Sequence, residues 1–294
     1  MQLDSRLHAF RPDLADERLR GKVDAERFVK GTPASVRLGC VDLKRSPSPD
    51  SANDSQLLFG EALLVFDRQE GYAWVQNLSD GYVGWIQEEA LGEPQPEPTH
   101  RLGVLRTPLL PEPKVRAPHR GFLSFGSRLA VIGWRDGYAE LAGGGWIFAE
   151  HLVELDRLEP DFTATACRFL GIPYLWGGRS SLGLDCSALV QLSLAAAGIA
   201  LPRDSDQQEA ASAAGQQLPP DTPRRRGDLL FWRGHVAIAL DSERVVNATG
   251  GPMLVVEEPF AALDARARAE SGSGLRSIRR LQDRSSQARL ANIA

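Results

Sequence analysis

The first half of the chain alternates apolar and polar residues in short runs, which are separated by glycine, aspartate and asparagine. A period of two is typical of half-buried β-strands joined by tight turns. The pattern extends from residue 23 to residue 157. It predicts an all-β region built from short strands.

Two stretches in this region resemble each other. The run FGEALLVFDRQEGYAWV begins at Phe59, and FGSRLAVIGWRDGYAEL begins at Phe125 with the same internal spacing. Further on, GWIQEEAL from Gly84 corresponds to GWIFAEHL from Gly145. Each copy occupies about 60 residues, close to the smallest size at which a domain folds alone. We therefore expect two small β-barrels in tandem.

The strand pattern of the two copies resembles bacterial SH3-like domains. Prolines within GEPQPEPTHR favour an extended, semi-rigid connection between the copies. The region is accordingly divided into an N-terminal segment at 1–22, a first SH3-like domain at 23–92, a linker at 93–101 and a second SH3-like domain at 102–157.

Beyond residue 158 the pattern changes to helices and then back to strands. Three segments combine a capping aspartate, helical spacing and a closing glycine, at 161–171, 185–198 and 204–215. Alternating apolar runs follow at 228–232, 235–240, 244–249, 253–258 and 275–281. Helices followed by strands predict an α+β domain with an antiparallel sheet. We place this domain at 158–284, with a C-terminal tail at 285–294.

Charge and composition argue against several classes of protein. The formal net charge is -4, and the arginine run at 224–226 is interpreted as a solvated turn, so we expect no nucleic-acid partner. No stretch approaches the roughly 20 apolar residues of a membrane span. Charges interrupt the first 22 residues, so we expect no signal peptide and a cytoplasmic location.

The chain has three cysteines, Cys40, Cys167 and Cys186, and none of them is at C-x-x-C spacing or joined by a histidine cluster. A reducing compartment keeps such thiols free. We therefore expect no disulfide, no zinc site and no cofactor.

Cys186 follows Asp185, a natural helix N-cap, which places the thiol in the first turn of a predicted helix. Backbone N–H groups and the helix dipole stabilise a thiolate there, whereas the charge of Asp185 opposes it. A histidine partner is therefore needed, and His235 is the only histidine of the α+β domain. Asn247, on the next predicted strand, is placed to orient its imidazole. The alternative for Cys186 is core packing, which is our interpretation of Cys167.

Four ordered motifs carry a family resemblance: PYLWGGRSSLGLDCSALVQ, LPRDSDQQ, GDLLFWRGHVAIAL and VVNAT. Together they resemble the NlpC family of papain-like cell-wall peptidases. The tandem SH3-like domains resemble the subgroup of γ-D-glutamyl-L-diamino acid endopeptidases, which cut muropeptides with a free N-terminal L-Ala between D-Glu and the diamino acid. The resemblance implies a papain-like fold, with Cys186 as nucleophile and His235 as base. Asn247 falls on the third position, which is often histidine in this family.

The resemblance also implies contacts with the substrate peptide. Tyr174 would border the nucleophile and shape the oxyanion site, and Trp176 would line the cleft. Asp185 is expected to face a substrate ammonium group, although it is also a plain N-cap. Asp204 and Ser205 suit a cap for the third helix equally well. The positions implied to contact the substrate in the α+β domain are Tyr174, Trp176, Asp185, Ser187, Asp204 and Ser205.

The two copies differ at positions where related enzymes use a glutamate and a tyrosine to close the substrate site. Glu61 of the first copy is replaced by Ser127 in the second, and Tyr82 falls on a glycine. We therefore expect Glu61 and Tyr82 to help bind the free amine of L-Ala. The second copy is interpreted as a spacer.

The sequence thus predicts a cytoplasmic cysteine endopeptidase that recycles cell-wall peptides, with a muropeptide as its substrate. One alternative is a secreted hydrolase of intact peptidoglycan. Another is a wall-peptide binding protein whose papain-like domain is inactive. An acyltransferase is a third alternative, because a thioester intermediate permits transfer as well as hydrolysis.

Overall fold

The computed structural model describes residues 3–281, and its internal contacts divide the chain into two units. The first unit comprises Met1–Leu158 and Leu175–Leu184, and the second comprises Glu159–Tyr174 and Asp185–Ala294. The chain therefore leaves the second unit after Tyr174 and re-enters it at Asp185. The predicted tail at 285–294 lies outside the described residues.

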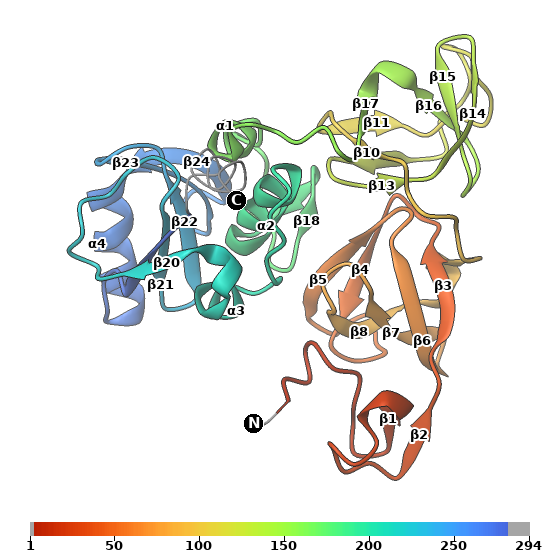
Figure 1. Cartoon of the computed structure of the whole chain (residues 1–294), viewed down its shortest axis with the longest axis horizontal. Helices are drawn as coiled ribbons and strands as arrows, with labels where there is room; N and C mark the ends of the chain where they lie inside the picture. The colour runs from red at the N-terminus through yellow and green to blue at the C-terminus, as the bar shows by residue number, and fades with distance from the viewer. Residues whose placement is uncertain (1–2, 282–294) are drawn as a thin grey trace, which may run out of the picture. The chain divides into compact units, whose positions relative to one another are not determined.

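The largest sheet of the first unit has seven strands in the order β5-β4-β8-β7-β6-β3-β9 (Figure 1). Apolar residues from alternate positions of these strands form its core, among them Val41, Leu63 and Val75. The hairpin between β6 and β7 turns at Glu70 and Gly71, both with positive φ, as a tight two-residue turn requires. The strands are β3 (Thr32–Val36), β4 (Cys40–Lys44), β5 (Asn53–Leu58), β6 (Ala62–Gln69), β7 (Tyr72–Asn77), β8 (Val83–Gln87) and β9 (Leu91–Gly92).

The N-terminal segment packs onto this sheet. Strand β1 (Leu14–Asp16) pairs in parallel with β2 (Arg27–Val29). The guanidinium group of Arg11 lies 4.3 Å from the ring centre of Trp74 and 5.0 Å from that of Trp85. Such stacking on two aromatic rings holds the segment in place.

The second copy of the repeat forms three small sheets around its own core. Its hairpin turns at Asp136 and Gly137, again with positive φ, at the position that matches Glu70 and Gly71. Phe59 from the first copy completes this core, so the two copies belong to one unit. The strands are β10 (His100–Leu102), β11 (Arg106–Pro108), β12 (Phe122–Ser124), β13 (Arg128–Leu129), β14 (Val131–Arg135), β15 (Tyr138–Leu141), β16 (Trp146–Phe148) and β17 (Leu152–Glu154).

The second unit has a six-stranded sheet in the order β20-β25-β21-β22-β23-β24. Its paired strands are antiparallel throughout, as the sequence pattern predicts. All five strands expected from the alternating runs are present, and β20 is an addition at the edge. The strands are β20 (Gln216–Leu218), β21 (Leu229–Trp232), β22 (His235–Ala239), β23 (Arg244–Thr249), β24 (Leu254–Pro259) and β25 (Ser277–Arg280).

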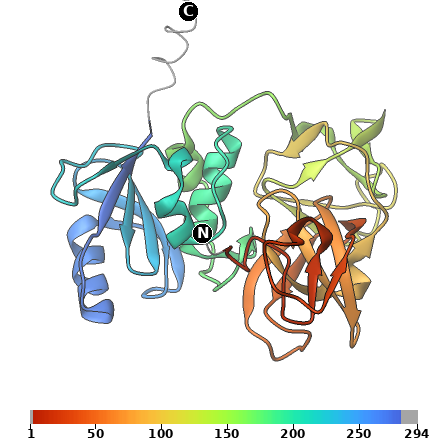
Figure 2. The same cartoon turned by 60° about the horizontal axis from the view of Figure 1, so that its bottom comes forward.

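Helices cover both faces of this sheet. Helix α2 packs on β22 and β23, and both views place α4 on the opposite side (Figures 1 and 2). Leu263 of α4 joins the core formed by Trp232, Ala237 and Val245. No helix among residues 3–281 is long and apolar enough to cross a membrane. The helices are α1 (Phe162–Cys167), α2 (Cys186–Ala196), α3 (Ser205–Ala210) and α4 (Phe260–Ser271).

Candidate active site

Cys186 is the first residue of α2, as predicted. The Asp185 carboxylate caps the helix by accepting the Ala188 N–H at 2.8 Å. Burial raises the pKa of the Cys186 thiol to about 12, and the charge of Asp185 adds to the effect. The N–H groups of Val236 and Ser187 and the charge of Arg203 act in the opposite direction. The sulfur is therefore a neutral thiol at neutral pH.

His235 begins β22, beside the residue whose N–H group acts on the Cys186 sulfur. Its Nε2 lies 3.0 Å from Asn247 Oδ1. Burial lowers the pKa of the imidazole to about 4, although the hydrogen bond that Asn247 Oδ1 accepts from Nε2 raises it. The structure thus brings together His235 and Asn247. Within the described residues no hydrogen bond joins the sulfur to the imidazole, and such bonds are often long before substrate binds.

Two residues that the sequence did not single out stand behind Asn247. Its Nδ2 donates a hydrogen bond to Glu258 Oε1 at 2.9 Å. Arg266 of α4 pairs with the same Glu258 carboxylate at 2.6 Å. Trp232 covers one side of the imidazole, with ring centres 6.0 Å apart. Only two adjacent glutamates in β24 hint at this arrangement, and sequence alone does not say which of them points inward.

Asp185 has a cationic partner within the protein. Arg203, which is fully buried, donates to both Asp185 oxygens, at 2.9 Å and 2.7 Å. The Ser187 hydroxyl donates to Asp185 Oδ1 and accepts from Arg203. Arg203 therefore balances the charge of Asp185 within the protein, and contact of Asp185 with a substrate ammonium group stays a prediction. The motif LPRDS contained Arg203, but its partner was not evident.

Asp204 and Ser205 lie where α3 begins. Asp204 is the N-cap and forms a capping box with Gln207, whose side chain accepts the Asp204 N–H at 3.4 Å. Gln208 of the same helix donates to the Ser187 carbonyl oxygen at 2.9 Å. The helix-capping role is thus present, and contact of Asp204 and Ser205 with substrate stays a prediction.

Tyr174 and Trp176 lie on opposite sides of a boundary between units. Tyr174 belongs to the second unit, where its N–H donates to the Met253 carbonyl oxygen at 2.9 Å. Burial raises the pKa of its phenol, and electrostatic interaction with the Cys186 and Asp185 side chains adds to the rise. Trp176 belongs to the first unit and is 65% exposed. Tyr174 therefore lies within electrostatic reach of the nucleophile, and the role of Trp176 stays a prediction.

Glu61 has a buried partner in the first unit. Arg179 of β18 (Arg179–Ser180) donates to both of its carboxylate oxygens, at 3.0 Å and 2.9 Å. Leu58 N–H and the Ser79 hydroxyl bind the same oxygens. Burial favours the neutral acid, but Arg179 and these donors outweigh it and lower the pKa of Glu61. The charge of Glu61 is thus balanced within the first unit, and its expected contact with the substrate amine stays a prediction.

Tyr82 is buried in the first unit, and its expected contact with substrate stays a prediction. Its ring lies in the core of the first β-region and is 4% exposed. The segment that follows Arg179 forms a short hairpin of β18 with β19 (Gly183–Leu184). Ser181 in this hairpin shares a hydrogen bond with Ser124 at 3.1 Å.

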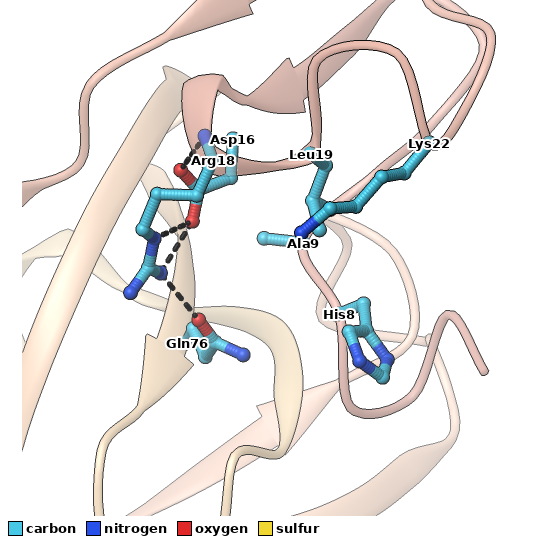
Figure 3. A pocket seen from close by; sticks show the side chains of 7 residues that line it. All are labelled: His8, Ala9, Asp16, Arg18, Leu19, Lys22 and Gln76. Atoms are coloured by element: carbon cyan, nitrogen blue, oxygen red, sulfur yellow. Dashed lines mark hydrogen bonds and ion pairs between the residues drawn. The ribbon is translucent and has the colours of Figure 1, made fainter. Parts of the chain in front are cut away.

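A separate hollow of about 240 Å³ lies in the N-terminal segment of the first unit (Figure 3). Its lining contains none of the residues predicted to act on substrate. Arg18 on one side is held by Asp16 and Gln76. The lining residues are His8, Ala9, Asp16, Arg18, Leu19, Lys22 and Gln76.

The remaining cysteines are free and lack the features of Cys186. Burial raises the pKa of the Cys40 thiol to about 12, and it also raises that of Cys167. Cys167 is the last residue of α1, away from the N-terminal N–H groups of that helix. Among residues 3–281 no cluster of three or more histidine, cysteine or acidic side chains is arranged to hold a metal ion.

Comparison with known proteins agrees with this geometry. Residues 171–262 match the NlpC/P60 family, and residues 43–91 match the bacterial dipeptidyl-peptidase Sh3 domain. The chain therefore carries a papain-like NlpC/P60 domain together with a bacterial SH3 domain. The two matches contain the predicted nucleophile, its histidine and the strands of the first copy.

Two curated relatives and one solved structure illustrate the similarity. The chain is 31% identical over 199 residues to the gamma-D-glutamyl-L-lysine dipeptidyl-peptidase of Bacillus subtilis, an alignment that covers 62% of this chain and 65% of the relative. It is 36% identical over 105 residues to dipeptidyl-peptidase 6 of Lysinibacillus sphaericus, covering 35% and 37%. An NlpC/P60 family protein from Bacillus cereus shares the fold, with a TM-score of 0.72, 19% identity and coverage of 86% of this chain and all of that one.

Proposed function

We propose that this chain is a cysteine endopeptidase that cleaves the γ-D-glutamyl bond to a diamino acid in peptidoglycan-derived peptides. The observation that carries the proposal is the start of α2, where the Cys186 sulfur lies at the N–H of Val236, next to His235 and its partner Asn247. A relative at 31% identity has a name that specifies a γ-D-glutamyl-L-lysine bond. A neutral thiol beside a neutral imidazole is the starting state for acyl transfer.

The reaction follows from these protonation states. His235 accepts the thiol proton as the sulfur attacks the γ-carbonyl carbon, and the backbone N–H of Cys186 stabilises the resulting oxyanion. The tetrahedral intermediate collapses to a thioester and expels the amine of the diamino acid, which takes the proton from His235. Water then attacks the thioester, giving its proton to His235, and the thiol is regenerated with release of the glutamyl carboxylate.

The proposed substrates are muropeptides with a free N-terminal L-Ala, and the proposed setting is peptidoglycan recycling in the cytoplasm. The names of both curated relatives, dipeptidyl-peptidases, support release of a dipeptide from a free N-terminus. We attribute this selectivity to the fit of the short N-terminal dipeptide, since Arg179 and Arg203 already balance the charges of Glu61 and Asp185.

Mass spectrometry of digestion products tests the proposal. L-Ala-γ-D-Glu-diaminopimelate should give L-Ala-D-Glu and free diaminopimelate, and the same peptide joined to muramic acid should be cut poorly. Equal cleavage of the two would favour a hydrolase of intact peptidoglycan. Products joined to an added amine would favour an acyltransferase, and binding without cleavage would favour a wall-peptide binding protein.

Cysteine variants supply matched controls for this assay. Cys186→Ala should abolish cleavage, because the thioester cannot form. Cys40→Ala and Cys167→Ala should retain activity, since neither thiol lies at the start of a helix. Full activity of Cys186→Ala would overturn the mechanism.

A further inference from the structure

The side-chain amide of Asn247 binds two neighbours. Its oxygen faces His235, and its NH₂ group donates to Glu258. The Asn247 side chain is fully buried, with Oδ1 at 3.0 Å from His235 Nε2 and Nδ2 at 2.9 Å from Glu258 Oε1. An amide that is rotated by half a turn exchanges its oxygen and nitrogen. Whatever fixes this rotation therefore fixes which imidazole nitrogen carries the proton.

Glu258 determines the rotation. Its side chain is 13% exposed and pairs with Arg266, whose two terminal nitrogens donate to both carboxylate oxygens at 3.1 Å and 2.6 Å. A carboxylate accepts hydrogen bonds and donates none, so the Asn247 group that faces it must be the NH₂. The amide oxygen of Asn247 then faces His235. Because this oxygen can only accept, His235 Nε2 must carry the proton of the hydrogen bond.

We propose that Glu258, with its charge balanced by Arg266, is a positioning residue that fixes the Asn247 amide and thereby keeps His235 in the Nε2–H tautomer. That tautomer leaves Nδ1 as the basic nitrogen for the proton of Cys186. The inference rests on the proposed cysteine peptidase activity, which supplies the step that the base serves.

The reversed amide would be strongly disfavoured. It would turn the Asn247 oxygen toward the Glu258 carboxylate and its NH₂ toward the protonated nitrogen of His235. Two buried hydrogen bonds would be replaced by two unfavourable pairs at a side chain that is fully buried. Without Glu258 only the unfavourable pair at His235 opposes the reversed amide. The Nδ1–H tautomer of His235 then becomes accessible.

Arg266 has a separate electrostatic role. The groups that act on His235 are the Asn247 amide on β23, Glu258 on β24, Arg266 on α4 and Asp185 at the start of α2. Glu258 and Asp185 raise the pKa of the imidazole, and Arg266 lowers it. The Glu258–Arg266 pair therefore orients the amide while its two charges largely cancel at the imidazole.

Steady-state kinetics with the γ-D-glutamyl peptide provide the first test. Glu258→Ala should lower kcat on the order of 10- to 100-fold, the effect of one lost buried hydrogen bond, with KM little changed. Glu258→Gln should recover much of this loss, since its amide oxygen can still accept from Asn247. Glu257→Ala and Arg244→Ala are the matched controls, because they remove a neighbouring exposed pair on the same strands and should leave kcat unchanged.

The pH dependence separates positioning from general loss of stability. Glu258→Gln leaves Arg266 unbalanced and should move the acid limb of kcat/KM to lower pH. Arg266→Met leaves Glu258 unbalanced and should move it to higher pH. A double-mutant cycle adds a coupling readout: Glu258→Ala should have almost no further effect in an Asn247→Ala background. Loss of activity in both variants without a shift of the acid limb would overturn the proposal.

Nitrogen NMR of histidine-labelled protein tests the tautomer without any substrate. His235 should be Nε2-protonated in the whole chain and a mixture of tautomers in Glu258→Ala, with thermal unfolding followed in parallel. If no peptide is cleaved, this signal still decides the role of Glu258 independently of the proposed activity. Glu258→Gln, which keeps an acceptor for Asn247, should stay mostly Nε2-protonated, and an unchanged His235 spectrum in folded Glu258→Ala would overturn the positioning role.

Discussion

The thiol of Cys186 and the imidazole of His235 are both held in their neutral forms by burial. The N–H groups at the start of α2 favour a thiolate, yet they offset only part of the desolvation that opposes it. In the proposed mechanism, a thiolate therefore forms when the thiol proton passes to His235 during attack. The pair would then work as a nucleophile with a general base, and the ion pair would exist only during the reaction.

This assignment predicts an unusually acidic lower limit of activity. His235 must be neutral to accept the thiol proton, and its pKa of about 4 keeps it neutral at pH 5. As the pH falls through 4 the imidazole becomes protonated and kcat/KM should fall. A pH profile of kcat/KM checks this, because it reports groups of the free enzyme. An acid limb near the ordinary histidine value would contradict the neutral pair.

Substitutions of Asn247 should separate orientation from proton transfer. Asn247→Ala should lower kcat, but by less than His235→Ala, because it removes the group that orients the base and spares the base itself. Asn247→His should keep partial activity, since a neutral imidazole can accept from His235 and donate to Glu258. Kinetics of the three variants decide the order. Wild-type rates in Asn247→Ala would assign the third role to another residue.

At the scale of elements, contacts between neighbours in sequence were predictable and distant pairs were not. The cap of α2 at Asp185 followed from local spacing, as did the strands that carry His235 and Asn247. The Glu61–Arg179 pair joins residues 118 positions apart, so the local sequence pattern does not predict this contact. Helix α4 escaped prediction because charged residues alternate with small ones from Asp264 onward and Leu263 is its only buried residue.

The pair of Glu61 with Arg179 yields a stability prediction. Their side chains are 4% and 9% exposed, so Glu61→Ala leaves Arg179 buried without a counter-charge. Breaking such a pair costs about 3–5 kcal/mol of unfolding free energy. Chemical denaturation of the first unit measures it. Replacing both residues by methionine should restore most of the stability, which amine recognition by Glu61 would not explain.

An exposed ion pair in the same β-region provides the control. Arg45 and Asp54 form a 2.6 Å contact, but the Arg45 side chain is 71% exposed. Asp54→Ala should therefore change the unfolding free energy by no more than about 1 kcal/mol. If Glu61→Ala is as mild as Asp54→Ala, the Glu61 carboxylate is unimportant for stability and its substrate role should be reconsidered.

At the scale of the whole molecule, the chain crosses between units three times. It passes from the first to the second after Leu158, returns at Leu175 and crosses again after Leu184. Residues 175–184 therefore belong with the β-rich first unit, while the residues on both sides of them belong to the second unit. The boundary expected at residue 158 coincides with the end of the first stretch of the first unit, and the short run at 175–184 belongs to that unit as well.

Limited trypsin digestion tests whether residues 175–184 depend on the rest of the first unit for their structure. In the whole chain Arg179 is 8% exposed and should resist cleavage. In a chain that begins at residue 159 its partner Glu61 is missing, so trypsin should cut after Arg179 within the folded fragment. The exposed Arg225 and Arg226 should be cut in both, which calibrates the digestion. Equal protection of Arg179 in the two chains would show that residues 175–184 fold without the first unit.

The Glu61–Arg179 pair also limits how such a gene can be recombined. A crossover at the codon for residue 158 would separate a carboxylate from the guanidinium that neutralises it. In a hybrid whose N-terminal half comes from a homologue, Arg179 would be buried without a counter-charge unless that half has an acidic residue at position 61. We therefore expect exchange between homologues to be tolerated when Glu61 and Arg179 are inherited together, or when the donor supplies an acidic residue at position 61.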